Sequence, residues 1–239
     1  MSPWRDSLDF VSRHFALISG VCFCFILPIQ IVYWLLVSML PLFFSVRVVT
    51  IHSWFLFLMC LVLCQIPFIL MLKQAEKTGD ISIVQILRTI VDRFWFILFR
   101  FLPFFVLVYF GLHLFVVPGA LIFVVLLFLP QGILLDLKNW RRGARTAWDL
   151  GFKYLGKCLM IFVSVLGILK LVQDGSAFLI TLYAQGHPIG LLLPPILGTL
   201  LYPLYSVFIT YLYLNWKEDL RSSSSWQAEA KTSKEYVIR

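Results

Sequence analysis

Residues 95–135 read WFILFRFLPFFVLVYFGLHLFVVPGALIFVVLLFLPQGILL, and Arg100 is the only Lys, Arg, Asp or Glu among them. A helix needs about 20 apolar residues to cross the hydrocarbon core of a bilayer. This stretch supplies that length on each side of the boundary before Pro118–Gly119. In lipid, apolar runs of this length must satisfy their backbone hydrogen bonds internally, as helices do. The stretch therefore predicts two membrane-spanning helices, residues 95–117 and 118–135.

The composition of the whole chain agrees with an integral membrane protein. Hydrophobic residues make up 61% of the 239 residues and charged residues 13%, against about 45–50% and 25% in soluble domains. The mean hydropathy is +0.91. These values exclude a soluble domain, a disordered chain and a nucleic-acid-binding module, although the net charge is +8. The cysteines number five, an odd count, and most lie in apolar runs, which argues against a disulfide framework.

Four further apolar stretches are candidates for spans. They are residues 15–38, 52–72, 158–172 and 189–214. The stretch 158–172 is short unless it borrows Tyr154 and Leu155. We expect an all-α, polytopic membrane bundle of six transmembrane helices. Residues 1–216 would form a single membrane domain, and residues 217–239 a flexible cytoplasmic tail.

The positive charges predict the orientation, because cytoplasmic loops retain Lys and Arg. With the N-terminus inside, 18 of the 20 Lys and Arg fall on the cytoplasmic side. Only Arg47 and Lys170 fall toward the other side. We therefore expect a multi-pass membrane protein with both termini in the cytoplasm.

A segment with a polar stripe at helical spacing precedes each pair of spans. The stripes are Arg5, Asp9, Ser12 and Arg13; then Ser82, Gln85, Arg88, Thr89, Asp92 and Arg93; then Arg142, Arg145, Thr146, Asp149, Lys153 and Lys157. Amphipathic helices of this kind, basic on one side and aromatic on the other, lie in the membrane interface. The pattern predicts three interfacial helices and three units, residues 1–72, 80–135 and 138–214. The alternative is that any long cytoplasmic loop lies on the membrane.

The layout resembles a group of bacterial six-span membrane proteins. The resemblance rests on the Pro118–Gly119 break and on residues 134–157, LLDLKNWRRGARTAWDLGFKYLGK. The group includes the YciC-type membrane proteins and the membrane domain of some glycerophosphodiester phosphodiesterases. Its members more often have Glu at the position of Asp136 and a small polar residue near that of Trp148. The resemblance implies the six-span fold and a bacterial cytoplasmic membrane, but no common reaction.

No set of residues in the sequence matches a known catalytic or metal site. Residues 151–158 have the spacing of a phosphate-binding loop, but Cys158 replaces its final hydroxyl and no sheet surrounds it. We interpret the glycine as allowing close helix approach, and Lys157 as an interfacial anchor. Ser206 and His113 are the only candidate nucleophile and base, and bonding within the bundle is the better interpretation. We expect no enzymatic activity and no cofactor or metal.

Two groups of residues are candidates for function. Arg141, Arg142 and Arg145 would contact anionic lipid headgroups. Polar or helix-bending residues inside the spans would border any cavity; these are Gln30, Gln65, Pro194, Pro195, Tyr202 and Pro203. The first hypothesis is a non-enzymatic accessory or scaffold protein of a lipid, envelope or export system. Its partners would be membrane lipids and other membrane proteins, but not nucleic acid. The alternative is a transporter or flippase of an uncharged or amphipathic solute.

Overall fold

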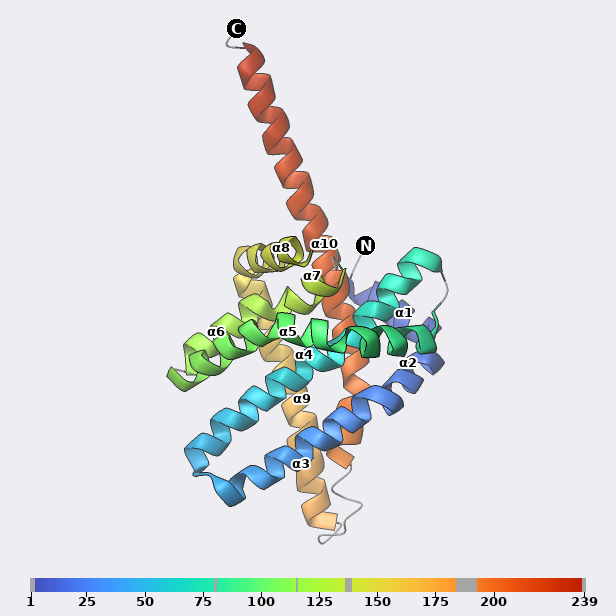
Figure 1. Ribbon diagram of the computed structural model, residues 1–239, viewed down its shortest axis with the longest axis vertical. Helices are drawn as coiled ribbons and strands as arrows, with labels where there is room; N and C mark the ends of the chain where they lie inside the picture. Colours follow the sequence, from blue (N-terminus) through green and yellow to red (C-terminus); the bar gives the residue numbers. More distant parts are fainter. Residues whose placement is uncertain (1–2, 80, 115, 136–138, 184–192, 238–239) are drawn as a thin grey trace.

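The computed structural model describes residues 3–79, 81–114, 116–135, 139–183 and 193–237, and within these ranges the chain is helical with no strand. The helices in chain order are α1 (Pro3–Arg13), α2 (Phe15–Val21), the π-helical turn η1 (Cys22–Ile26), α3 (Leu27–Phe43), α4 (Val46–Thr78), α5 (Ile83–Leu114), α6 (Val116–Val125), the 3₁₀ turn η2 (Leu126–Phe128), α7 (Leu129–Leu135), α8 (Trp140–Lys153), α9 (Leu155–Tyr183) and α10 (Leu193–Val237). The helix pairs α3–α4, α5–α6 and α9–α10 pack against each other (Figure 1).

Five described helical segments are long and apolar enough to cross a membrane. They are Phe15–Phe43, Val48–Thr78, Ile83–Leu114, Val117–Leu135 and Pro195–Leu220. Each contains or largely overlaps one of the expected spans. The remaining expected span, residues 158–172, falls in α9, whose described apolar part is Leu155–Val165. Six spans therefore remain a prediction, and the structure supports five.

The distribution of burial shows which helices lie inside the bundle and which are exposed on its surface. The most apolar part of α4 is 78% buried, whereas that of α5 is 28% buried although it is nearly as apolar. Large side chains such as Trp95, Phe99 and Phe110 are exposed along α5. In water such a surface would be an aggregation site, but it suits contact with acyl chains. Helix α4 is thus the centre of the bundle.

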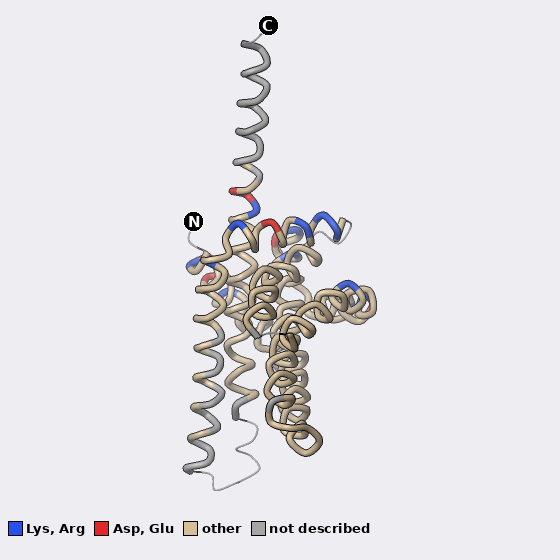
Figure 2. Tube along the Cα trace, turned by 90° about the vertical axis from the view of Figure 1, so that its left-hand side faces the viewer, with Lys and Arg blue, Asp and Glu red and all other residues tan. Residues whose placement is uncertain are grey.

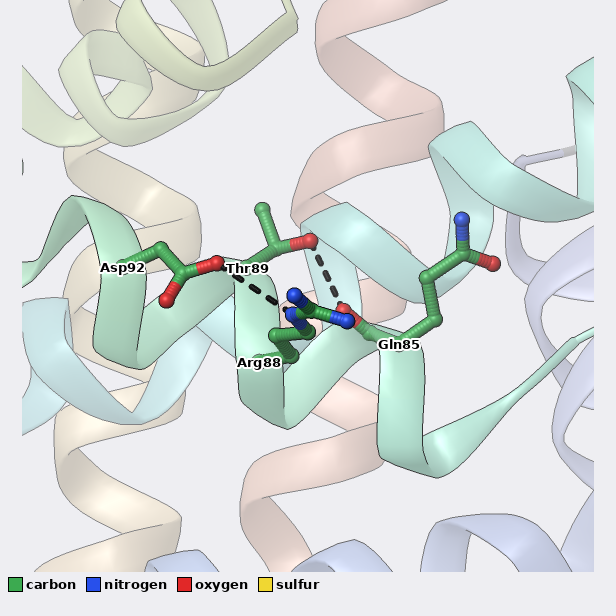
Figure 3. A network of polar contacts seen from close by, with 4 residues as sticks. All are labelled: Gln85, Arg88, Thr89 and Asp92. Carbon is green, nitrogen blue, oxygen red and sulfur yellow. Dashed lines mark hydrogen bonds and ion pairs between the residues drawn. The ribbon is translucent and has the colours of Figure 1, made fainter.

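The expected interfacial segments take two different forms. Helices α1 and α8 are separate and short. The middle segment, by contrast, continues into the following span as the first third of α5 (Figure 3). No proline or glycine lies between Asp92 and Trp95, so nothing breaks the helix there. On its exposed side, Arg88 forms an ion pair with Asp92 at 3.7 Å, and Thr89 donates a hydrogen bond to the carbonyl oxygen of Gln85 at 2.7 Å.

A π-helical turn sets the inward face of the first span. Ile18, Cys22, Ile26 and Gln30 are all buried, at intervals of four residues. In a regular α-helix, four-residue steps drift by about 40° each, because each residue turns the chain by about 100°. The wider turn at η1 takes up one extra residue. It thereby keeps this stripe directed at the bundle interior.

Glycines allow the closest helix contacts. A Cβ atom on Gly132 would lie 2.8 Å from the carbonyl carbon of Gly143, and one on Gly151 would lie 2.9 Å from the carbonyl carbon of Val125; each would lie closer still to the carbonyl oxygen. These contacts seat α8 on α7 and α6. The interpretation that glycine here allows close helix approach is therefore confirmed for Gly151. At Gly156, by contrast, a Cβ atom would have nothing within 4 Å.

The charged residues that the structure describes gather at the end of the bundle where the chain termini lie (Figure 2). Helix α10 starts at the opposite end, crosses the bundle and continues as a helix to Val237 (Figure 1). The segment from residue 217, expected to be flexible, thus continues α10 as far as Val237.

Candidate functional site: a buried polar cluster and a basic helix

A hydrogen-bonded cluster around Gln65 joins three helices in the interior. Gln131 on α7 donates from Nε2 to Oε1 of Gln65 on α4 at 3.0 Å, and Gln65 donates from Nε2 to the hydroxyl of Tyr205 on α10 at 3.4 Å. Turning the Gln131 amide over brings its nitrogen within 3.3 Å of the Leu127 and Phe128 carbonyl oxygens. In that orientation the Gln131 oxygen faces Oε1 of Gln65, so the Gln65 amide must turn over as well for the two side chains to bond. Gln65 would then donate to Gln131 and accept from the hydroxyl of Tyr205, and the cluster links the three helices in either arrangement.

The same cluster includes Ser206, which the sequence suggested as a possible nucleophile. Its hydroxyl donates to the backbone oxygen of Gln65 at 3.3 Å, and Thr210 donates to the backbone oxygen of Ser206 at 2.8 Å. Ser206 is fully buried, whereas His113 is exposed and bonds to the carbonyl oxygen of Tyr109 at 3.1 Å. The bonding interpretation of Ser206 is confirmed.

A second cluster surrounds Gln30 on α3. Its Nε2 donates to Sγ of Cys60 at 3.2 Å and lies 3.9 Å from Sγ of Cys64. The two sulfur atoms on α4 are 3.8 Å apart. Tyr202 on α10 completes the cluster, since its hydroxyl lies close enough to interact with Gln30 and both cysteines. The structure therefore brings Gln30 and Tyr202 together, and places Gln65 in the neighbouring cluster.

Two buried oxygen atoms of the second cluster have no aligned hydrogen-bond partner among the described groups. They are Oε1 of Gln30 and the hydroxyl of Tyr202. Both side chains are fully buried. Because an unbonded buried polar atom costs roughly 1–3 kcal/mol, this position suits an internal water molecule or the polar group of a ligand.

The prolines of the last span have a structural role. Pro195 and Pro203 are buried, and Pro203 lies inside α10. The carbonyl oxygen of Pro195 accepts a hydrogen bond from the hydroxyl of Thr199 at 2.7 Å. The side chain of Pro194 lies outside the described residues.

Helix α8 presents its arginines outward. Arg141, Arg142 and Arg145 are exposed, while Gly143, Ala147, Leu150 and Gly151 are buried against the bundle. Small residues of α8 pack on α6 and α7, whereas its aromatic residues Trp148 and Phe152 remain exposed. The arrangement leaves a row of guanidinium groups on a rigid support.

Two basic residues near α8 belong to this region, although their roles were not predicted. Lys73 donates from Nζ to the carbonyl oxygens of Leu134 and Leu135, at 2.8 and 2.9 Å, at the C-terminus of α7. A cation at this position also complements the helix dipole. The guanidinium carbon of Arg100 lies 3.2 Å from the ring centroid of Phe96 and 5.0 Å from that of Trp140. The contacts of Lys73 with α7 and of Arg100 with Trp140 join residues far apart in the sequence, which is why they could not be predicted.

Comparison with known protein families, with curated proteins and with solved structures finds no match to this chain. The resemblance to the YciC-type group therefore remains a prediction from the sequence. Among the described residues, no group of three or more His, Cys, Asp or Glu is placed to hold a metal ion.

Proposed function

We propose that this chain is a multi-pass protein of a cytoplasmic membrane that serves as a non-enzymatic accessory or scaffold protein of a lipid, envelope or export system. In this proposal α9 is the sixth span, both termini are cytoplasmic, and α8 binds anionic headgroups. One observation carries the proposal: the polar side chains of the interior mostly bond to one another, while the guanidinium groups of α8 point outward from a rigid seat.

The basic helix is the part that would act on lipids. A Lys or Arg near an anionic membrane surface contributes about 1 kcal/mol of attraction, so three arginines would favour anionic lipid strongly. We expect the triple variant Arg141→Gln, Arg142→Gln, Arg145→Gln to lose most of the selection for phosphatidylglycerol over phosphatidylcholine. The measurement is the lipid retained by protein extracted from nanodiscs of mixed composition. Unchanged selectivity would contradict a headgroup role for α8.

A control of the same residue type is available on α5. Arg88 is exposed and forms the ion pair with Asp92, so Arg88→Gln removes one positive charge outside α8. This variant should leave anionic-lipid selection near the wild-type value. Equal losses in Arg88→Gln and Arg141→Gln would indicate a general effect of net charge.

The unbonded oxygen atoms of Gln30 and Tyr202 favour a second candidate, a transporter or flippase of an uncharged or amphipathic solute. The native cysteines distinguish the two candidates, because Cys60 and Cys64 lie beside these atoms and are buried, whereas Cys24 is exposed. If the interior is closed, a small water-soluble thiol reagent should spare Cys60 and Cys64 in folded protein and modify them after denaturation. Modification of folded protein in a Cys24→Ser background would instead reveal a water-filled path and favour transport.

A further inference from the structure

A polar cavity of about 480 Å³ lies at the charged end of the bundle, between α1, the C-terminal end of α4 and α10. Its lining residues come from three helices that are far apart in the sequence. They are Asp6, Asp9, Arg13, Glu76, Gly79 and Tyr211, together with Phe10, His14, Leu72 and Ala75. Gly79 ends α4 in the left-handed conformation, with φ of 76°, and this turn closes one side of the cavity.

The lining combines negative and positive groups that do not neutralise one another. Three carboxylates and one guanidinium border the cavity, but none of them takes part in an ion pair within the described part of the chain. Asp6, Glu76 and Arg13 are all close enough to the hydroxyl of Tyr211 to interact with it electrostatically. Glu218 on α10 adds negative charge and repels Glu76. The cavity is therefore a mixed but mainly negative site whose charges converge on one position.

The position of α1 places this cavity at the level of lipid headgroups. The Trp4 ring packs on Phe208 of α10, with ring centroids 5.7 Å apart. Trp4, Leu8 and Phe15 are exposed on one side of the α1–α2 segment, as in a helix that contacts lipid. Asp6, Asp9 and Arg13 lie on the other side. The cavity consequently opens on the water-facing side of α1.

Aromatic side chains form the remaining wall. The Phe10 ring centroid lies 6.4 Å from that of Tyr211 and 4.9 Å from that of His14. Such rings attract an organic cation through their π faces, and the carboxylates accept the hydrogen bonds that a primary ammonium group donates. Arg13 supplies the donor geometry that suits a phosphate.

We propose that this cavity binds the headgroup of an amine-bearing zwitterionic phospholipid of the phosphatidylethanolamine type. The ammonium group is held by Asp6 and Glu76, with Asp9 beside them, and the phosphate by Arg13. An anionic lipid is disfavoured because the carboxylates outnumber the guanidinium. A phosphatidylcholine headgroup is disfavoured because its quaternary ammonium has no N–H to donate. The proposal depends on membrane placement but not on the α8 arginines.

The test uses full-length protein in nanodiscs that contain equal amounts of phosphatidylethanolamine and phosphatidylcholine. Native mass spectrometry of the extracted protein gives the ratio of the retained lipids. We expect the wild type to retain phosphatidylethanolamine in several-fold excess. The double variant Asp6→Asn, Glu76→Gln should bring the ratio of the two lipids close to one, because it removes both charged acceptors of the ammonium group. Asp149→Asn is the matched control, since Asp149 is exposed on α8.

Each result has a defined meaning. An unchanged lipid ratio in Asp6→Asn, Glu76→Gln, or an equal change in Asp149→Asn, would overturn the proposal. Loss of both zwitterionic lipids in Arg13→Gln supports the phosphate contact, and no loss overturns it. Competition by soluble phosphoethanolamine, leaving lipid retention at background, would identify a free metabolite as the ligand. The melting temperature of each variant shows whether it is folded, and the α8 variants report separately on the proposed function.

Discussion

The seat of α8 can be tested at a single glycine. In Gly151→Ala the added Cβ would lie 2.9 Å from the carbonyl carbon of Val125 and closer still to its carbonyl oxygen, whereas ordinary contacts are 3.4–4 Å. Because the obstacle is backbone and not a flexible side chain, α8 and α6 must move apart to relieve the contact. Overpacking of this kind costs about 1–3 kcal/mol. The gain in helix propensity from Gly to Ala, up to about 1 kcal/mol, offsets part of it.

Gly156 provides the matched control, because it lies near the start of α9 with nothing within 4 Å of a Cβ atom. Gly156→Ala should therefore gain helix propensity without any cost from overpacking. The free energy of unfolding should then be about 1–3 kcal/mol lower in Gly151→Ala than in Gly156→Ala. For a chain of this length, this corresponds to a melting temperature lower by roughly 5 °C. Thermal unfolding in detergent can be followed with a thiol-reactive fluorophore, because Cys158, near the start of α9, is buried in the folded protein. Equal melting temperatures for the two variants would refute the close approach of α8 and α6.

The remaining predictions concern the interior links. Gln65→Leu and Gln131→Leu should each lower the free energy of unfolding by about 1–2 kcal/mol. The double variant should lower it by about 0.6–1.7 kcal/mol less than the sum of the two single effects. Strict additivity in this double-mutant cycle would mean that the amides are not coupled. Lys73→Met should cost about 1.5–3 kcal/mol because two carbonyl oxygens at the end of α7 lose a charged donor. Lys77→Met, one turn further along α4 and exposed, should be nearly neutral, and similar melting temperatures for the two lysine variants would argue against the cap.

The span positions were predictable because apolar length is a local property of the sequence. Residues 52–72 fall within α4, and residues 95–114 of the next expected span fall within α5. The junction between the polar-striped segment and the span in α5 was not predictable in the same way. A 3.6-residue period marks both an independent interfacial helix and the amphipathic start of a longer one. Only a break between them would distinguish the two cases, and residues 92–95 contain none.

The candidate site was predicted in its residues but not in its connections. Gln30, Gln65 and Tyr202 stood out because polar side chains are costly in spans. Their grouping into two clusters depends on which faces of α3, α4 and α10 meet, and the sequence does not contain that information. Arg13 lay in a predicted interfacial segment and Glu76 lay outside every predicted element, so the pattern gave no indication of the cavity between α1 and α4.

The π-helical turn at residues 22–26 gives the first span a place where it can lose one residue. Deleting Phe23, which is exposed, would let the helix become regular, and Ile18, Cys22, Ile26 and Gln30 would then be spaced by four, three and four residues. At about 100° per residue these spacings keep all four side chains on one face, so Gln30 would stay beside Cys60. The same deletion just after the turn, between Ile26 and Gln30, would instead rotate Gln30 by about 100° toward the acyl chains. Variants shorter by one residue should therefore be tolerated within this turn and harmful just beyond it.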